Sequence, residues 1–210
     1  MSFDAVAPWY RWLERLRFGG LLQEARVALV EAWEGDPPNK VLVLGDGDGR
    51  FVAEAKKQWP KAQFTLVDAS VRMMSFAKRR LAQHENVNFV VTPVEDYLDG
   101  ARNRQFDLMV SHFFLDCFHE DTLRQLVPRL ANMLSEKGQW LVTDFQPGST
   151  GWQRANVWLM IRFFRLAAGM EASSLPCISK CLEGAELRAE KGIQFSSGWI
   201  RSDLWRCWET

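Results

Sequence analysis

Short apolar runs alternate with amphipathic helical stretches through the middle of the chain. Five apolar runs are typical of buried strands, at 41–44, 63–67, 86–91, 106–111 and 138–143. Between them, apolar residues recur at helical spacing in 51–59, 70–81 and 121–134, and Ser70 is a natural N-cap for the second of these helices. Because strands that alternate with helices pair in the same direction, this rhythm predicts a parallel sheet with helices on both faces.

The two ends of the chain follow different patterns. Helical spacing runs over residues 3–33 and is broken by Gly19-Gly20, so we expect a leading helix and a second helix from Leu21. Residues 152–170 predict a long apolar helix, and 177–183 a short helix that ends at Gly184. Two closing strands are expected over 186–191 and 194–206, with a hairpin turn at Lys191-Gly192. The predicted fold is a three-layer α/β/α sandwich with a mostly parallel seven-stranded sheet and a C-terminal antiparallel hairpin.

Three glycines at every second position follow the first strand. Gly45, Gly47 and Gly49 leave no side chain above the backbone, so a ligand can lie against the turn and bind its amides and the start of the next helix. The second strand ends on Asp68. A strand-helix-strand unit brings such a residue beside the turn, where a carboxylate can accept both hydroxyls of a ribose. The pattern therefore predicts a nucleotide-type ligand.

Other ligand motifs do not fit the spacing of this turn. A dinucleotide fingerprint needs a third glycine where this chain has Arg50, a P-loop needs Gly-Lys-Ser/Thr, and Asp46-x-Asp48 lacks the later residues of a calcium loop. Gly-x-Gly-x-Gly, with an acidic residue ending the second strand, resembles the class I S-adenosylmethionine (SAM) methyltransferases. The resemblance covers roughly Val41 to Asp144. It implies a Rossmann-like fold and SAM as cofactor, with S-adenosylhomocysteine as product.

The resemblance also implies which residues contact SAM. Asp68-Ala-Ser-x-x-Met73 looks like the family's second motif, in which Asp68 would hold the ribose and Met73 would pack on the adenine. Ser111-His-Phe-Phe-Leu-Asp116 resembles the fourth motif, at a strand end that borders the ligand crevice. Ordinary helix packing is the alternative for Met73. The residues expected to bind the cofactor are Gly45, Asp46, Gly47, Gly49, Asp68, Ala69, Met73, Val94, Glu95 and Ser111.

Two positions depart from the family pattern. The family usually carries an acidic residue two places before the first glycine, near the methionine ammonium, and this chain has Val43 there. Asp46 is our candidate to take over that role. After the third strand, many relatives have Gly-Asp-Ala where this chain has Thr92-Pro93-Val94. Pro93 offers neither a carboxylate nor an N–H, so adenine recognition is expected to pass to the Val94 backbone and Glu95.

The first residues resemble one branch of the family. Phe3-Asp-x-Val-Ala-Pro-x-Tyr10 looks like the opening of the ubiquinone/menaquinone-biosynthesis methyltransferases, where a leading helix closes over SAM and substrate. The length of 210 residues suits a single domain over 1–210. Its parts would be a helical lid (1–35), a nucleotide-binding core (40–145), a helical cap (151–184) and a closing hairpin (185–208). The alternative for Trp9 and Trp12 is plain packing on the domain.

The long helix over 152–170 has two interpretations. Arg154, Arg162 and Arg165 interrupt its apolar residues, so it is not a membrane span. It is either a cap over the active site, our preferred interpretation, or an amphipathic element in peripheral contact with lipid. Aromatic residues at both ends of the chain, among them Tyr10 and Trp158, indicate a small, largely apolar or aromatic acceptor, because a charged molecule would lose its hydration there.

Methyl transfer from a sulfonium is an in-line displacement, so alignment and desolvation can supply most of the acceleration. A weakly acidic acceptor also needs a base, and the candidates are His112, Tyr10, Asp116 and His119. His112 stands at the strand-end motif and has an unperturbed pKa suited to a base near neutral pH. Alternatively, it only lines the pocket. No paired carboxylates or metal-ligand constellation stand out, so we expect no metal.

Composition narrows the function classes. Lys and Arg number 26, as do Asp and Glu, and the pI is about 6.8, which argues against a nucleic-acid footprint. Lys56-Lys57 and Lys78-Arg79-Arg80 are expected on solvent faces of helices. The absence of a basic-then-apolar N-terminal signal favours a cytoplasmic location. The prediction is therefore SAM-dependent methyl transfer, with two rivals: a non-catalytic SAM-fold binding protein, or a nicotinamide oxidoreductase, against which Arg50 argues.

Overall fold

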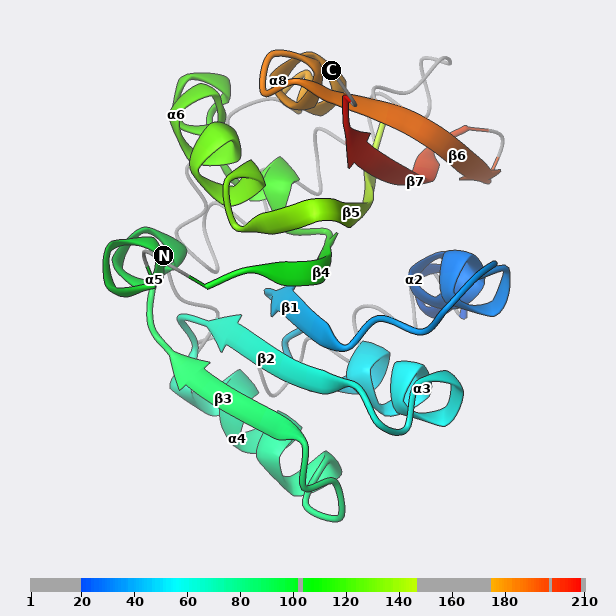
Figure 1. Cartoon of the computed structure of the whole chain (residues 1–210), viewed down its shortest axis with the longest axis vertical. Helices are drawn as coiled ribbons and strands as arrows, with labels where there is room; N and C mark the ends of the chain where they lie inside the picture. The colour runs from blue at the N-terminus through cyan, green and yellow to red at the C-terminus, as the bar shows by residue number, and fades with distance from the viewer. Residues whose placement is uncertain (1–19, 102–103, 147–174, 197, 209–210) are drawn as a thin grey trace.

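A seven-stranded sheet forms the centre of the computed structural model, which describes residues 20–101, 104–146, 175–196 and 198–208. The strand order is β3-β2-β1-β4-β5-β7-β6 (Figure 1). The strands are β1 (Lys40–Leu44), β2 (Gln63–Asp68), β3 (Val87–Val91), β4 (Phe106–His112), β5 (Leu134–Phe145), β6 (Leu187–Phe195) and β7 (Ile200–Cys207). β1 to β5 pair in parallel, and β7 is antiparallel to both of its neighbours. The predicted mostly parallel sheet with a C-terminal hairpin is confirmed.

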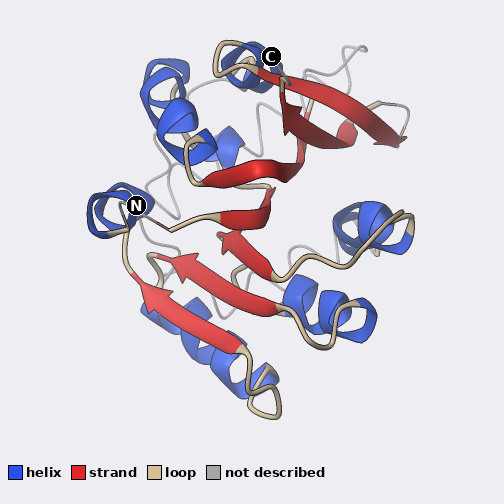
Figure 2. Cartoon of the chain, viewed as in Figure 1, coloured by secondary structure: helices blue, strands red, loops and turns tan. Residues whose placement is uncertain are grey.

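Helices cover both faces of this sheet (Figure 2). They are α2 (Leu21–Glu31), α3 (Arg50–Gln58), α4 (Val71–Arg80), α5 (Val94–Gly100), the 3-10 turn η1 (Leu115–Cys117), α6 (Glu120–Ala131) and α8 (Ile178–Glu183). One core layer joins the sheet to α2, α3 and α4, and a second joins it to α5, α6 and α8. Burial of these two apolar layers supplies the main driving force for the fold, and it leaves the carboxyl ends of β1, β2 and β4 at one edge.

Two predicted boundaries were wrong for identifiable reasons. The hairpin does not turn at Lys191-Gly192, because β6 continues to Phe195, which pairs with the first residue of β7, Ile200. Gly192 instead pairs with Asp203, whose carboxyl group occupies the space that a Cβ would take. The helix expected to reach residue 134 ends at Ala131, because Leu134 pairs with the first residue of β4 and opens β5 early.

Two of the basic residues expected on solvent faces make structural contacts, and only one of them is buried. Lys56 is buried, and its ammonium donates hydrogen bonds to the carbonyl oxygens of Ala62 and Pro60 at 2.9 and 3.2 Å. Arg80 binds Asp48, as described below. The predicted leading helix with Tyr10 and the predicted helix over 152–170 lie outside the described residues. Within the described ranges, no helix has the length and apolarity needed to cross a membrane.

Candidate active site

The turn after β1 opens its backbone to a cleft at the carboxyl edge of the sheet. Gly45, Gly47 and Gly49 have φ values of 68°, 64° and 78°, which residues with a side chain rarely adopt. A Cβ on Gly45 would lie 2.5 Å from the Phe114 ring, and one on Gly49 would lie 3.1 Å from helix α4. A Cβ on Gly47 would contact only the end of the Met73 side chain, at 3.7 Å. Packing therefore requires the outer two glycines, while Gly47 faces the ligand space.

Asp68 stands beside the turn, at the end of β2. Its Oδ2 accepts a hydrogen bond from the Gly47 N–H at 3.2 Å, and its Oδ1 accepts one from the Ser70 N–H at 2.8 Å. The Ser70 hydroxyl caps α4 as predicted, because it accepts a hydrogen bond from the Met73 N–H at 3.1 Å. Asp68 thus joins the glycine turn to the start of α4, and it also lines the cleft. We call residues 45–49 together with Asp68 the glycine wall.

Asp46 has two functions in the glycine wall. Its carboxylate accepts hydrogen bonds from the backbone N–H groups of Phe51 and Val52, each at 3.2 Å, and so caps α3. Burial raises its pKa to about 7, although the Val52 amide and the charge of Arg26 act in the opposite direction. Asp46 also lines the cleft. A positively charged ligand group beside it would favour the ionised carboxylate.

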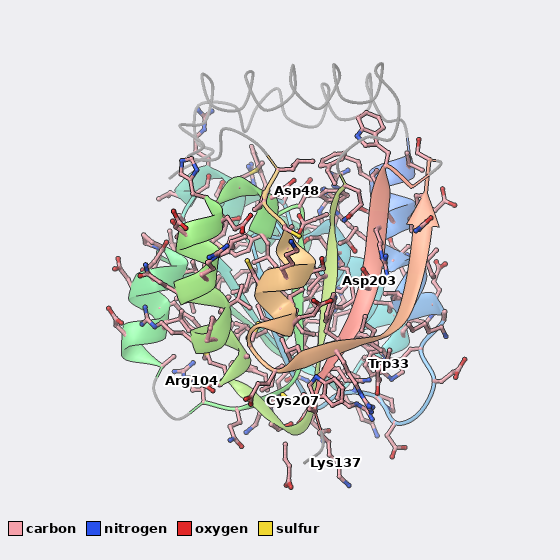
Figure 3. The ribbon with its side chains drawn as sticks, turned by 90° about the horizontal axis from the view of Figure 1, so that it is seen from above. Trp33, Asp48, Arg104, Lys137, Asp203 and Cys207 are labelled. Carbon is pink, nitrogen blue, oxygen red and sulfur yellow. The ribbon has the colours of Figure 1, made fainter. Side chains whose placement is uncertain are left out.

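Asp48 fastens the glycine wall to the end of α4. Its carboxylate is almost fully buried and accepts hydrogen bonds from Arg50 Nε and Arg80 Nη2, each at 2.9 Å. Arg80 Nε also donates to the Asp48 backbone carbonyl at 2.9 Å. Figure 3 places Asp48 at this edge of the sheet, with Lys137 and Cys207 at the opposite edge. Arg80 therefore anchors the turn although the residue remains exposed, as the sequence predicted.

His112 and Arg26 both line the cleft, one at the end of β4 and one on α2. The imidazole of His112 is buried and packs edge-on against Phe51, with the ring centroids 4.7 Å apart. Among the described residues, neither of its nitrogens has a hydrogen-bond partner. Burial, and then the positive charge of Arg26, lower the pKa of His112 well below its usual value. The imidazole is therefore neutral near pH 7.

Aromatic side chains form the wall opposite the glycine turn. Phe113, Phe114 and Phe118 line the cleft, and we call them the aromatic wall. Phe113 has a φ of 52°, a strained conformation for a residue with a side chain. The ring of Phe113 lies 5.1 Å from the Arg26 guanidinium, and the rings of Phe114 and Phe118 pack edge-on at 5.2 Å. The wall thus combines apolar surface with local backbone strain.

The structure brings most of the predicted cofactor residues to one cleft. Eight of the ten line it: Gly45, Asp46, Gly47, Asp68, Ala69, Met73, Val94 and Glu95. Gly49 packs on α4 instead. Ser111 is fully buried, and its hydroxyl accepts a hydrogen bond from Trp140 Nε1 at 3.0 Å, away from the cleft lining. Counted out to bulk solvent, the empty space of the cleft is about 1020 Å³.

Asp116 is a predicted catalytic candidate that the structure places outside the cleft lining. It is buried in η1 behind the aromatic wall and does not line the cleft. Its carboxyl group faces that of Asp144, so the sequence-based expectation of no paired carboxylates was wrong. The partners lie on different segments, and only the pairing of β4 with β5 brings them together. His119 is exposed at the start of α6 and does not line the cleft.

Sequence reasoning missed several residues of the cleft. Phe113 and Phe114 were inside the motif quoted from Ser111 to Asp116, where two consecutive aromatic residues at a strand end were the available signal. Arg26 had no such signal, because it lies on α2, remote in sequence from the glycine turn. Both kinds of residue reach the cleft only through tertiary contacts, because β4 pairs with β1 and α2 packs on α3 and β7.

Comparisons with known proteins agree with this geometry. A family profile described as a methyltransferase domain matches residues 41–138. The chain is 27% identical over 148 residues to demethylmenaquinone methyltransferase of Thermotoga maritima, and the aligned region covers 70% of this chain and 62% of that protein. It is 26% identical over 113 residues to malonyl-acyl-carrier-protein O-methyltransferase of Halalkalibacterium halodurans, and the aligned region covers 53% of this chain and 41% of that protein.

A solved structure with a similar fold contains the demethylated form of the expected cofactor. The N-methyltransferase NodS of Bradyrhizobium japonicum WM9, solved with S-adenosylhomocysteine, matches with a TM-score of 0.62 and 16% identity, over 90% of this chain and 84% of that one. At this identity the likeness concerns the fold alone. The chain spans 62% or less of the length of the two curated relatives named above. The matched domain and the relatives together support a class I SAM-dependent methyltransferase domain in the matched part of the chain.

Proposed function

We propose that this chain binds SAM in the cleft and transfers its methyl group to a small, largely apolar or aromatic acceptor by in-line displacement. The observation that carries the proposal is the convergence of the glycine turn, Asp68 and the His112 strand end on one cleft. Gly47 leaves space for a ligand there, since only Met73 lies within 4 Å of where its Cβ would stand. A ligand can therefore approach the backbone of the turn closely.

The lining of the cleft supports one orientation of the cofactor. Asp68 would hold the ribose hydroxyls, and Met73, Val94 and Glu95 would surround the adenine. All four line the cleft, at the end of β2 or on the helices that follow β2 and β3. Asp46 and Arg26 would bind the methionine part of SAM. Asp46 suits the ammonium and Arg26 the carboxylate by charge alone. Val43 cannot serve, because its side chain is buried in the core on the α3 face.

Bound SAM would supply an electrophilic methyl group on a sulfonium. The chain's own contribution is to exclude water and align the acceptor, because such a displacement gains chiefly from orientation and desolvation. The aromatic wall provides the dry surface. His112, held neutral by burial and by Arg26, can accept a hydrogen bond from an acceptor hydroxyl. A low pKa makes it a weak base, so we assign it to alignment more than to proton storage.

The two curated relatives are named for different acceptors, demethylmenaquinone and a malonyl group on acyl carrier protein. The polarity of the acceptor is therefore inferred from the side chains of this chain. The described wall is aromatic, and Tyr10 and Trp158 are proposed to complete the cover. We expect Tyr10→Phe or Trp158→Ala to lower turnover while SAM affinity stays within about 1 kcal/mol, the usual range for changes away from the bound group.

The test is a screen of quinols, phenols, fatty acids and polar amines with methyl-labelled SAM. The proposal expects label in a flat or lipid-like acceptor. Robust labelling of a polar amine alone would contradict the acceptor class. Tight SAM binding with no labelling in any class would favour the rival of a non-catalytic binding protein, which the departures at Val43 and Pro93 motivate.

A further inference from the structure

Two buried carboxyl groups stand behind the aromatic wall. Asp116 is 6% exposed and Asp144 is 1% exposed, and their side chains face each other across η1 and the end of β5. Two carboxylates this close cannot both be ionised without a large electrostatic cost. A carboxyl pair at the edge of a ligand cleft is therefore a feature that requires a function.

The pair is connected to the backbone of the aromatic wall. Oδ1 of Asp144 accepts a hydrogen bond from the Phe114 N–H at 3.1 Å. The Phe113 N–H donates to the Thr143 carbonyl at 2.6 Å, next to Asp144 in β5. On the other side, the Cys117 thiol donates to Asp116 Oδ1 at 3.5 Å. The strained turn at Phe113 and Phe114 is thus held from behind by this group.

One oxygen in this group needs a proton. Oδ2 of Asp144 is buried and has no hydrogen-bond partner among the described residues, although the nearby Asp116 backbone N–H favours the ionised form of Asp144. A single proton held between the two side chains would supply that hydrogen bond and remove one of the two charges. Burial raises the pKa of both groups, to about 6 for Asp116 and well above the usual value for Asp144.

We propose that Asp116 and Asp144 are a positioning pair that shares one proton and fixes the Phe113–Phe114 turn as a wall of the cofactor cleft. The inference rests on the proposed SAM site. Phe114 stacks over Gly45, and Phe113 lies under the Arg26 guanidinium, so displacement of this turn would move two groups that face the cofactor. Besides each other, the titratable group that faces the pair is the Cys117 thiol, on which the Asp68 carboxylate also acts.

The test compares three variants of the full chain. Asp144→Asn keeps an oxygen for the Phe114 N–H and presents a permanent N–H to Asp116, so it imitates the protonated acid. Asp144→Leu removes both the acceptor for the Phe114 N–H and the donor for Asp116. Asp203→Asn is the matched control, because Asp203 is also buried with a raised pKa but pairs with Arg201 in the hairpin. Each protein is measured by calorimetry with S-adenosylhomocysteine from pH 6 to 10, and by amide hydrogen exchange without ligand.

We expect Asp144→Leu to weaken binding about tenfold at pH 7, the scale for a buried N–H left without its acceptor. Asp144→Asn and Asp203→Asn should bind within about threefold of the wild type. The wild type should lose affinity at alkaline pH as the shared proton leaves, and Asp144→Asn should lose less. Exchange of the Phe114 amide should accelerate in Asp144→Leu and not in Asp144→Asn.

Two results would overturn the proposal. The first is an Asp144→Leu protein that melts earlier but binds like the wild type when folded, which would make the pair merely structural. The second is unchanged exchange at Phe114 in Asp144→Leu. If the wild type binds no S-adenosylhomocysteine, the proposed function fails, and the exchange data still decide whether the pair holds the turn.

Discussion

The glycine wall and the aromatic wall of the cleft satisfy their polar groups in different ways. In the glycine wall, the carboxylates of Asp46, Asp48 and Asp68 border the cleft and accept hydrogen bonds from backbone amides or arginines. In the aromatic wall, the rings face the cleft and the carboxyl groups of Asp116 and Asp144 are hidden behind them. One wall can therefore bind the polar parts of a nucleotide-like ligand, and the other can exclude water.

The largest expected effect comes from closing the glycine wall. Gly47→Val places a branched side chain at a φ of 64° and into the ligand space. We expect SAM affinity to fall by about 100-fold or more, roughly 2.7 kcal/mol, with the sheet intact by circular dichroism. Gly100→Val is the control, because a Cβ there meets nothing within 4 Å. Normal SAM binding by Gly47→Val would show that the turn is only structural.

The next effect concerns the ribose partner. Asp68→Ala should weaken SAM binding by about 2 kcal/mol, the scale for losing hydrogen bonds to a charged acceptor. Asp107→Ala is the matched control, because Asp107 also accepts hydrogen bonds from two backbone amides, of Asn39 and Lys40, but at the opposite edge of the sheet. It should lower stability and leave the calorimetric affinity unchanged. Equal losses of affinity in both variants would contradict the assignment of Asp68.

A pH series of chemical unfolding separates the two walls. Raised carboxyl pKa values mean that the folded state binds more protons than the unfolded state. The free energy of unfolding contributed by these groups is therefore lost as the pH rises from about 4, up to about 6 for Asp116 and about 7 for Asp46. Asp116→Asn should flatten the decline between pH 4 and 6, and Asp46→Asn should flatten it up to pH 7. His112 contributes the opposite slope in all three proteins. Identical slopes in all three would refute this account.

The smallest expected signal is at His112. Because its pKa is lowered by burial and Arg26, its imidazole NMR resonances should stay at the neutral position from pH 8 to 6. An imidazolium signal from His112 at pH 7 would mean that the cleft is wetter than the structure shows, and would restore a role as a proton store.

Local sequence patterns predicted the glycine wall well. Gly45 to Gly49, Asp68 and the Ser70 cap follow from short-range rules about turns, strand ends and helix starts, and all appear where those rules place them. The aromatic wall was predicted only in part. Its motif was recognisable, but the partner of Asp116 was not, because Asp144 reaches it through the pairing of β4 with β5.

The errors share one physical cause, which is tertiary contact that overrides a local signal. Gly192 matched a turn by composition, yet the neighbouring strand requires a glycine there because the Asp203 side chain lies across it. Lys56 looked like a surface charge, but carbonyl oxygens at the end of α3 bind its ammonium. Arg26 gave no local signal at all, and its place in the cleft depends on how α2 packs.

Isothermal titration of the full chain with SAM, S-adenosylhomocysteine and NAD(H) tests the central claim most directly. The account predicts saturable binding of SAM and S-adenosylhomocysteine to one site, no heat from the nicotinamide dinucleotide, and loss of both signals in Gly47→Val. A folded wild-type protein that binds neither sulfur nucleotide, or that binds NAD(H) in their place, would contradict it.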